Sequence, residues 1–228
     1  MAASNFFAFF KGLYRSATKN YRQKTGDRPD TDIYFDPAFA EVLEKWGVKN
    51  AWREIQFLLG DRTGKVLDLA CGTARTHDFI KRFTCLEYYG CDISSMLIER
   101  AIKRGISNER LRVQDAAKLD YADGQFDYLF SIGSLEHFTL AGLRSTLAEC
   151  RRVCRGINFH QIPVSRSGLN EGWITPYQSY WNNSEKWWSD IFKEVFGSNL
   201  WVMTSKWGDS KSRGVWFICG DEDFFVND

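Results

Sequence analysis

The chain has 228 residues, enough for one domain with its own hydrophobic core. Thirty basic residues stand against 29 acidic ones, so the formal charge is +1 and there is no global positive field to attract nucleic acid. No run of 18 apolar residues could span a membrane. These features favour a small neutral or zwitterionic substrate over a nucleic-acid partner.

The six cysteines predict free thiols in a reducing compartment. The opening "MAASNFFAFFKGLY" has too short an apolar run for a cleavable signal, and no positive segment precedes that run. We therefore expect a cytoplasmic protein without disulfides. Cys150 and Cys154 have no second Cys or His pair at zinc-like spacing, so we expect buried small side chains and no metal.

Short apolar strands alternate with helical patterns along the chain. Apolar residues three and four apart over 38–61 predict one or two helices that stop at Gly60. Next come predicted strands at 65–71, 86–94, 111–117, 126–134 and 157–163, with helices at 75–83, 96–104 and 139–153. A helical pattern resumes over 173–196, and 199–207 with 213–219 is expected to form an antiparallel hairpin. The alternation predicts an α/β fold whose mostly parallel sheet carries helices on both faces.

The stretch "GKVLDLACGTARTHDFI", residues 64–80, joins the first strand of this sheet to a helix. In an open parallel sheet the ligand lies beyond the carboxyl ends of the strands, and small residues in the first turn let the backbone approach it. Asp68 can organise the turn and receive a cationic group. Asp92 ends the next strand, where an acid can accept both hydroxyls of a ribose. Both acids therefore point to a ligand that contains a nucleoside.

Two enzyme classes fit such a turn. A dinucleotide enzyme needs the pattern G-x-G-x-x-G, whereas the corresponding positions are Ala70, Gly72 and Arg75. "VLDLACGTA" instead resembles the first motif of the class I S-adenosylmethionine-dependent methyltransferases, commonly V-L-D-x-G-x-G-x-G. Alanine at 70 and 74 departs from that motif, keeping the turn small but excluding conformations that only glycine adopts.

Further motifs in the same order extend this resemblance over residues 64–162. "CDIS" resembles the second motif, "VQDAAKLDYADGQFDYLFS" the third and fourth, and "LEH" the end of the fourth strand in the small-molecule (type 11-like) branch. The resemblance implies a Rossmann-like, doubly wound sheet of seven strands, mostly parallel, with the last strand (213–219) antiparallel. It also implies that residues 1–60 form a helical lid or cap and that 61–228 form the methyltransferase domain, with an aromatic-rich helical insertion at about 165–196.

The cofactor that this resemblance implies is S-adenosyl-L-methionine, converted to S-adenosyl-L-homocysteine. The residues implied to hold it are Asp68, Ala70, Gly72, Thr73, Asp92, Ile93, Met96, Asp115, Ala116 and Ile132. Asp92 would bind the ribose and Asp115 the adenine amino group. Ile93 and Met96 would pack on the adenine, and Ile132 would close the pocket near the sulfonium.

Methyl transfer to a hydroxyl needs an aligned nucleophile, a dry pocket and a base. His137, in "GSLEHF" after the fourth strand, is the first candidate base, although it could instead pack and hydrogen-bond the loop. His160, in "NFHQIP", is the reserve candidate. Glu136 would border the acceptor pocket or support the loop.

Aromatic residues mark the candidate acceptor region. Trp173, Tyr177, Tyr180 and Trp181 could stack on a sugar or planar ring, or could simply anchor the insertion. Residues 1–26 carry five basic residues and no acid beside several aromatic ones, which fits weak contact with an anionic membrane or a lid over the cofactor. We favour the lid.

The function expected from these features is methyl transfer to a small molecule, at an oxygen of a sugar or ring-bearing metabolite. One alternative is transfer to nitrogen or carbon of a small molecule or lipid. Another is a catalytically silent subunit that binds S-adenosylmethionine for a partner. The sequence does not name the acceptor or the oligomeric state.

Overall fold

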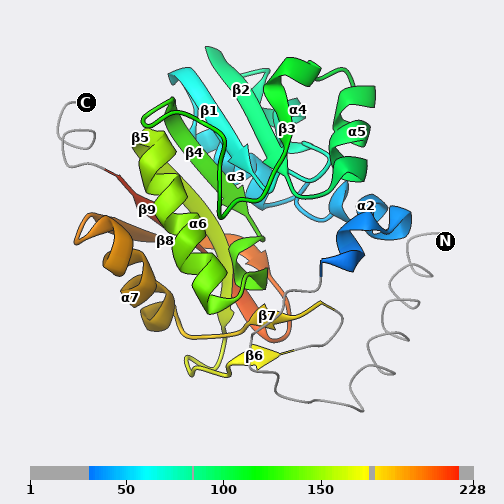
Figure 1. The fold of residues 1–228 in the computed structure, drawn as a ribbon. Helices are drawn as coiled ribbons and strands as arrows, with labels where there is room; N and C mark the ends of the chain where they lie inside the picture. Colours follow the sequence, from blue (N-terminus) through cyan, green and yellow to red (C-terminus); the bar gives the residue numbers. More distant parts are fainter. Residues whose placement is uncertain (1–30, 84, 175–177, 221–228) are drawn as a thin grey trace.

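The computed structural model describes residues 31–83, 85–174 and 178–220, and these form a sheet with helices on both faces (Figure 1). Its seven strands lie in the order β3-β2-β1-β4-β5-β9-β8. The strands are β1 (Thr63–Leu69), β2 (Cys85–Asp92), β3 (Leu111–Val113), β4 (Phe126–Ile132), β5 (Cys154–Ser165), β8 (Leu200–Gly208) and β9 (Ser212–Cys219). The α-helices are α2 (Pro37–Leu43), α3 (Ala51–Leu58), α4 (Thr76–Ile80), α5 (Ser95–Lys103), α6 (Leu140–Val153) and α7 (Glu185–Phe196). Three 3-10 turns, η2 (Asp32–Phe35), η3 (Asn108–Arg110) and η4 (Leu135–His137), and a separate pair, β6 (Trp173–Ile174) with β7 (Tyr180–Trp181), complete the described elements.

The sheet confirms the predicted fold class. β1 to β5 pair in parallel, and β9 runs antiparallel to both β5 and β8. From β1 the chain builds outward to β2 and β3, then returns to the other side of β1 with β4 and β5. The strand order therefore reverses between β1 and β4, and their carboxyl ends border the crevice where such folds bind ligands.

Alternating side chains of the strands fill two cores, one on each face of the sheet. Leu67 belongs to the core beneath α6 and α7, where Leu147 and Phe192 also lie. The adjacent Val66 belongs to the opposite core, with Ile55 of α3. Successive strand residues point to opposite faces, so one apolar run serves both layers.

Polar caps fix where the helices around the crevice begin. Asp36 accepts a hydrogen bond from the Ala38 amide at the start of α2, and Pro37 occupies the first helical turn. Ser94 accepts from the Leu97 amide at the start of α5, and Thr139 accepts from the Gly142 amide at the start of α6. Each cap begins a helix directly after a loop that borders the crevice.

The predicted helical pattern over 173–196 is wrong in its first half. Trp173 and Ile174 pair as a strand with Trp181 and Tyr180, and α7 begins only at Glu185. The periodic apolar residues before that point are rings that pack within this strand pair.

Two strands differ in length from their predictions. β3 stops at Val113 because the Asp115 side chain accepts from the Ala117 amide and turns the chain. β5 continues to Ser165, and Pro163 is tolerated because the pairing with β4 has already ended at Gln161. Gln161 therefore stands where the crevice begins.

Candidate active site

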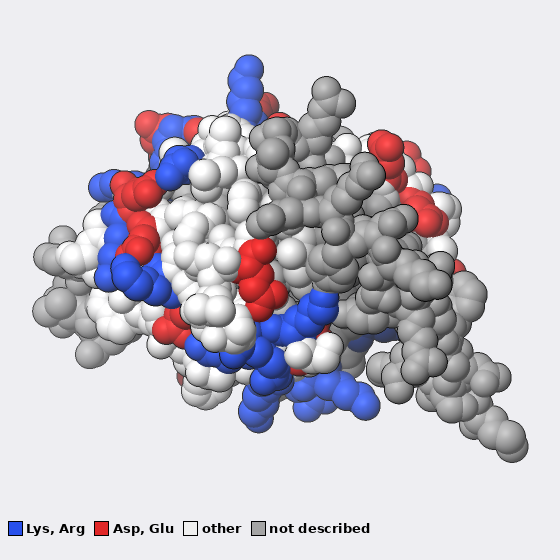
Figure 2. Space-filling model, turned by 90° about the horizontal axis from the view of Figure 1, so that it is seen from below, with Lys and Arg blue, Asp and Glu red and all other residues white. Residues whose placement is uncertain are grey.

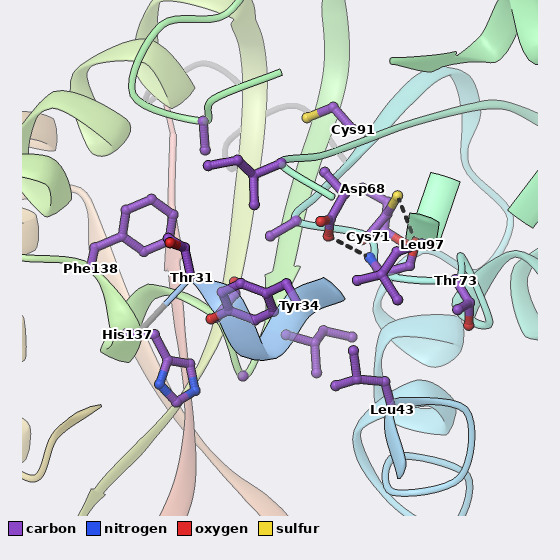
Figure 3. Close-up of a pocket in the computed structure, with 18 of the residues that line it drawn as sticks. Thr31, Tyr34, Leu43, Asp68, Cys71, Thr73, Cys91, Leu97, His137 and Phe138 are labelled. Atoms are coloured by element: carbon purple, nitrogen blue, oxygen red, sulfur yellow. Dashed lines mark hydrogen bonds between the residues drawn. The ribbon is translucent and has the colours of Figure 1, made fainter. Parts of the chain in front are cut away.

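A cavity of about 290 Å³ opens beyond the carboxyl ends of β1 and β4, at the switch point where the strand order reverses. Its walls come from the first turn after β1, the ends of β2 and β4, the segment after β3, and the N-terminal elements η2, α2 and α3. In Figure 3, Phe138 and His137 lie at one end of the cavity and Thr73 at the other, with Tyr34 between them. The fold thus brings residues from six separate segments, including Gln178, to one pocket.

The turn after β1 takes a left-handed backbone at three alternate positions. Ala70, Gly72 and Ala74 have φ values of 55°, 56° and 53°. For a residue other than glycine, this conformation costs roughly 1–2 kcal/mol. Alanine therefore adopts the turn at an energetic cost and still keeps it small, and Ala70 and Gly72 both line the cavity.

Asp92 holds this turn against the end of β2. Its Oδ2 accepts from the Gly72 amide at 2.8 Å, and its Oδ1 accepts from the Ser94 amide at 2.9 Å. Burial raises the pKa of this carboxyl, while the two amide donors oppose that shift. Both oxygens keep further acceptor capacity, so the predicted ribose contact is compatible with the geometry.

Asp68 lies buried at the floor of the cavity. Its Oδ2 accepts from the Tyr88 hydroxyl at 2.7 Å and from the Thr76 hydroxyl. Burial raises the pKa of this carboxyl to about 7, although both hydroxyl donors lower it. The side chain is therefore poised to become an anion when a cation approaches, which suits the predicted contact with the amino-acid part of the cofactor.

Most of the other predicted cofactor residues also line the cavity, and one does not. Those that line its wall are Thr73, Ile93, Asp115, Ala116 and Ile132. Met96 lies in the first turn of α5 outside the wall, and the adjacent Leu97 lines the cavity instead, with only 1% of its surface exposed. One residue along a helix turns the side chain by about 100°, so the prediction missed the correct face.

His137 borders the cavity from η4, directly after β4. Its Nδ1 lies 2.8 Å from the Ser179 carbonyl oxygen. A carbonyl only accepts, so Nδ1 carries the proton and Nε2 of the neutral ring can take one up. Glu136 Oε1 lies 3.6 Å from that Nε2. This tautomer is the one that a general base requires.

His160 is not placed at the cavity. It is fully buried in β5, its Nδ1 lies 2.8 Å from the Ser131 hydroxyl, and its ring packs 5.3 Å from that of Phe192 of α7. Burial lowers its pKa to about 3. Its ring faces α7 and lines no part of the cavity, so the structure removes it as a reserve base.

The predicted aromatic acceptor residues lie beside the cavity rather than in its wall. Trp173 is buried 5.1 Å from the ring of Trp181, whose indole N–H donates to the Phe138 carbonyl. Tyr180 packs edge-on 6.3 Å from the His137 ring. These rings anchor the segment, as the alternative expected. Tyr177 and residues 1–26 lie outside the described residues.

The sequence predicted a helical lid or cap over residues 1–60, but it did not identify which residues of η2, α2 and α3 form the wall of the cavity. The residues that this wall contributes are Thr31, Tyr34, Phe39, Leu43, Trp46 and Trp52. The Tyr34 carbonyl accepts from the Ser94 hydroxyl at 2.6 Å, and the Tyr34 hydroxyl accepts from the Gln178 side chain at 2.5 Å. The Asp36-Pro37 cap was the available signal that an ordered helix begins here.

A second cavity of about 190 Å³ adjoins the first on the side of β5 and β8. The two share walls at Phe39, Leu43, Trp46, Gly133, His137 and Gln178. Glu136, Gln161 and Trp207 line only the second cavity. His137 therefore stands at the boundary between two adjoining cavities.

Comparisons with known proteins agree with this geometry. Residues 66–156 match the family model of the methyltransferase domain. The demethylmenaquinone methyltransferase of Thermotoga maritima is 34% identical over 113 residues, which cover 48% of each chain. The probable tRNA methyltransferase 9B of Bos taurus is 31% identical over 127 residues, covering 54% of this chain and 26% of the relative. The chain thus spans half or less of the length of these curated relatives.

Solved structures show the same fold. The 1,6-didemethyltoxoflavin-N1-methyltransferase of Burkholderia thailandensis, with bound 1,6-didemethyltoxoflavin and S-adenosylhomocysteine, superimposes with a TM-score of 0.64 at 15% identity, over 94% of this chain and 90% of that one. A SAM-dependent methyltransferase from Aquifex aeolicus gives a TM-score of 0.59 at 16% identity, over 81% and 99%.

The motif order, the strand order and the cavity at the switch point define a Rossmann-like ligand-binding domain. Residues 66–156 match the methyltransferase domain, which agrees with the predicted resemblance to the class I S-adenosylmethionine-dependent methyltransferases. Within the described ranges, no helix is long and apolar enough to cross a bilayer, and no cluster of three or more His, Cys, Asp or Glu side chains could hold a metal ion.

Proposed function

We propose that the protein transfers a methyl group from S-adenosylmethionine to an oxygen of a sugar or ring-bearing small molecule. The observation that carries this proposal is the orientation of His137. The Ser179 carbonyl fixes the proton on Nδ1, and the ring lies where the two cavities meet. A base at that boundary can serve an acceptor in the second cavity that faces the first.

The residues around the first cavity fit the cofactor. Asp68 offers a buried carboxyl to the ammonium group, and the small residues of the first turn leave the backbone open to the carboxylate end. Asp92 and Asp115 stand at the ends of the second strand and the third, where the ribose and adenine are expected. When bound, the cofactor supplies an electrophilic methyl group on a sulfonium.

The residues of this chain orient the acceptor and remove its proton. The acceptor oxygen forms a bond to the methyl carbon as the bond from that carbon to sulfur breaks, and the hydroxyl proton passes to Nε2 of His137. The apolar wall from Phe39, Leu43 and Trp46 limits the access of water to the reacting atoms.

Release of S-adenosylhomocysteine with a panel of hydroxylated ring compounds and sugars tests the proposal. His137→Ala should lower kcat by roughly 10²–10⁴, the usual contribution of a general base. Affinity for S-adenosylhomocysteine, measured by calorimetry, should stay within about threefold, since a base acts on the transition state. A variant that keeps most of its turnover would argue for a nitrogen or carbon acceptor.

Methylation of RNA is a second candidate, since three curated relatives are described as probable tRNA methyltransferases. The formal net charge of +1 gives it little support. Figure 2 shows Lys and Arg beside Asp and Glu around a broad uncharged area, with further Lys and Arg side chains gathered along the lower edge of the view. Methyl incorporation into total tRNA, run beside the small-molecule panel, separates the two. No turnover with either, despite cofactor binding, would favour the silent subunit.

A further inference from the structure

The second cavity contains buried polar atoms that no protein group satisfies. Gln161 is 1% exposed, and neither its side-chain oxygen nor its nitrogen has a hydrogen-bond partner among the described residues. Glu136 is 4% exposed, and its Oε2 is likewise without a partner there. Both side chains line the second cavity. Leaving a buried polar group without a hydrogen bond costs free energy. The two side chains therefore mark a site where a polar ligand could supply the missing hydrogen bonds.

We propose that the second cavity binds a planar ring bearing a hydrogen-bond donor and an acceptor on neighbouring atoms, as a lactam or imide does. This ring is the body of the methyl acceptor, so the inference rests on the proposed function and narrows its substrate class to lactam-type heterocycles.

The side chains of Gln161 and Glu136 can pair with the N–H and C=O of a lactam. The Gln161 amide supplies both a donor and an acceptor. Burial raises the pKa of Glu136 to about 8, so at neutral pH its carboxyl is protonated and also supplies both. A ring with N–H beside C=O satisfies such groups in pairs, whereas a sugar hydroxyl or an apolar ring leaves part of the set unpaired.

Aromatic walls favour a flat ligand. The rings of Trp46 and Trp207 meet nearly at right angles, with centroids 6.2 Å apart, and both line the cavity. Trp46 also lies against Gly133, where an added Cβ would come within 2.9 Å of the indole. The two indoles therefore present one ring face and one ring edge to the cavity. Aromatic rings prefer to stack on a face or to pack against an edge.

Gly214 of β9 leaves room in the sheet for the Gln161 side-chain amide. A Cβ placed on Gly214 of β9 would lie 2.5 Å from the Gln161 nitrogen, so only glycine leaves this amide in place. In register, Gln161 faces Ile132 at the last pair between β5 and β4. The amide consequently lies at the edge of the crevice, near the boundary that His137 marks.

The rival explanation is that water alone fills the cavity. Water would satisfy the same atoms without preferring any ring. The two explanations differ in whether a lactam edge is recognised.

The test uses the full chain saturated with S-adenosylhomocysteine and two probes, quinolin-2-one and quinoline. They share one bicycle, and only the first carries N–H beside C=O. We expect quinolin-2-one to bind at least ~10-fold more tightly than quinoline in calorimetry or NMR titration, because quinoline leaves buried polar groups without hydrogen bonds. Gln161→Leu should reduce that preference to less than ~3-fold.

Matched variants keep the result interpretable. Glu136→Gln retains a donor and an acceptor and should preserve the preference, whereas Glu136→Leu should reduce it. Gly214→Ala should displace the amide and act like Gln161→Leu. Without probe, Gln161→Leu should raise the Tm, because it removes an unsatisfied buried group.

Equal affinity for the two probes, or an unchanged preference in Gln161→Leu and Gly214→Ala, would overturn the proposal in favour of water. Failure of the proposed function looks different. In that case quinolin-2-one would still bind preferentially, but no hydroxylated lactam would release S-adenosylhomocysteine.

Discussion

The buried carboxyl of Asp68 predicts that cofactor binding depends on pH. Burial raises its pKa to about 7, so near neutrality the cofactor-free protein holds this group partly protonated. If the ammonium of the cofactor binds the carboxylate, binding must be accompanied by loss of that proton. Affinity for S-adenosylhomocysteine should therefore increase as pH rises through 7 and level off above it.

The magnitude follows from the protonated fraction. With a pKa of about 7, the fraction of carboxylate is about one half at pH 7 and about one tenth at pH 6. Between pH 8 and pH 6 the dissociation constant should rise by roughly 10-fold, which corresponds to about 1.4 kcal/mol. The Tyr88 and Thr76 hydroxyls hold the carboxylate in place throughout.

Calorimetry with S-adenosylhomocysteine from about pH 5.5 to 8.5, in buffers of different ionisation enthalpy, measures both affinity and proton release. Asp68→Asn should bind more weakly at pH 8 and lose most of the pH dependence. Tyr88→Phe should keep the pH dependence but shift it to higher pH, because it removes a hydroxyl that lowers the pKa of Asp68. The reasoning is refuted if the wild-type affinity is flat across this range, or if Asp68→Asn retains the full slope.

Three further outcomes follow from the same geometry. Asp92→Ala should weaken S-adenosylhomocysteine binding by about 1–3 kcal/mol in calorimetry, and unchanged affinity would remove the ribose assignment. Ala70→Gly relieves a left-handed alanine worth roughly 1–2 kcal/mol at an entropic cost of roughly 0.5–1, so urea unfolding should show a small gain in stability; a loss would contradict the strain argument. The pKa of Glu136, raised by burial to about 8, means that the folded state holds a proton that the unfolded state has lost. The free energy of unfolding should therefore fall by up to about 1.4 kcal/mol per pH unit between pH 5 and 8, and Glu136→Gln should reduce that slope. Equal slopes in the two proteins would show that Glu136 does not cause the pH dependence.

Local motifs predicted several residues that the structure brings to the first cavity. The turn from Asp68 to Ala74 and the end of β2 at Asp92 are short segments. Residues that are close in the sequence of such a segment are also close in the folded protein, so the motif itself shows which of them lie together. The strand alternation likewise determined the sheet, because parallel strands require crossovers of this kind.

The acceptor end could not be predicted from the same signals. His160 and Gln161 are adjacent on β5, and only the strand's alternation relative to α7 shows that the histidine faces the core and the glutamine the second cavity. Trp46 and Trp207 are far apart in sequence and meet through tertiary packing alone. Apolar periodicity shows that a residue will be buried but not against what it packs.

The position of β9 between β5 and β8 has a consequence for how the chain is made. The exposed side of β5 stays unpaired until β9 has been synthesised, an interval of several seconds at ~5–20 residues per second. An open parallel edge of that kind is prone to pairing with other chains. Newly made chains that end before Ser212 would hold the complete cofactor turn beside an unfinished wall, with Gln161 lacking the glycine that leaves room for it. Such chains should bind chaperones more persistently than chains released at full length.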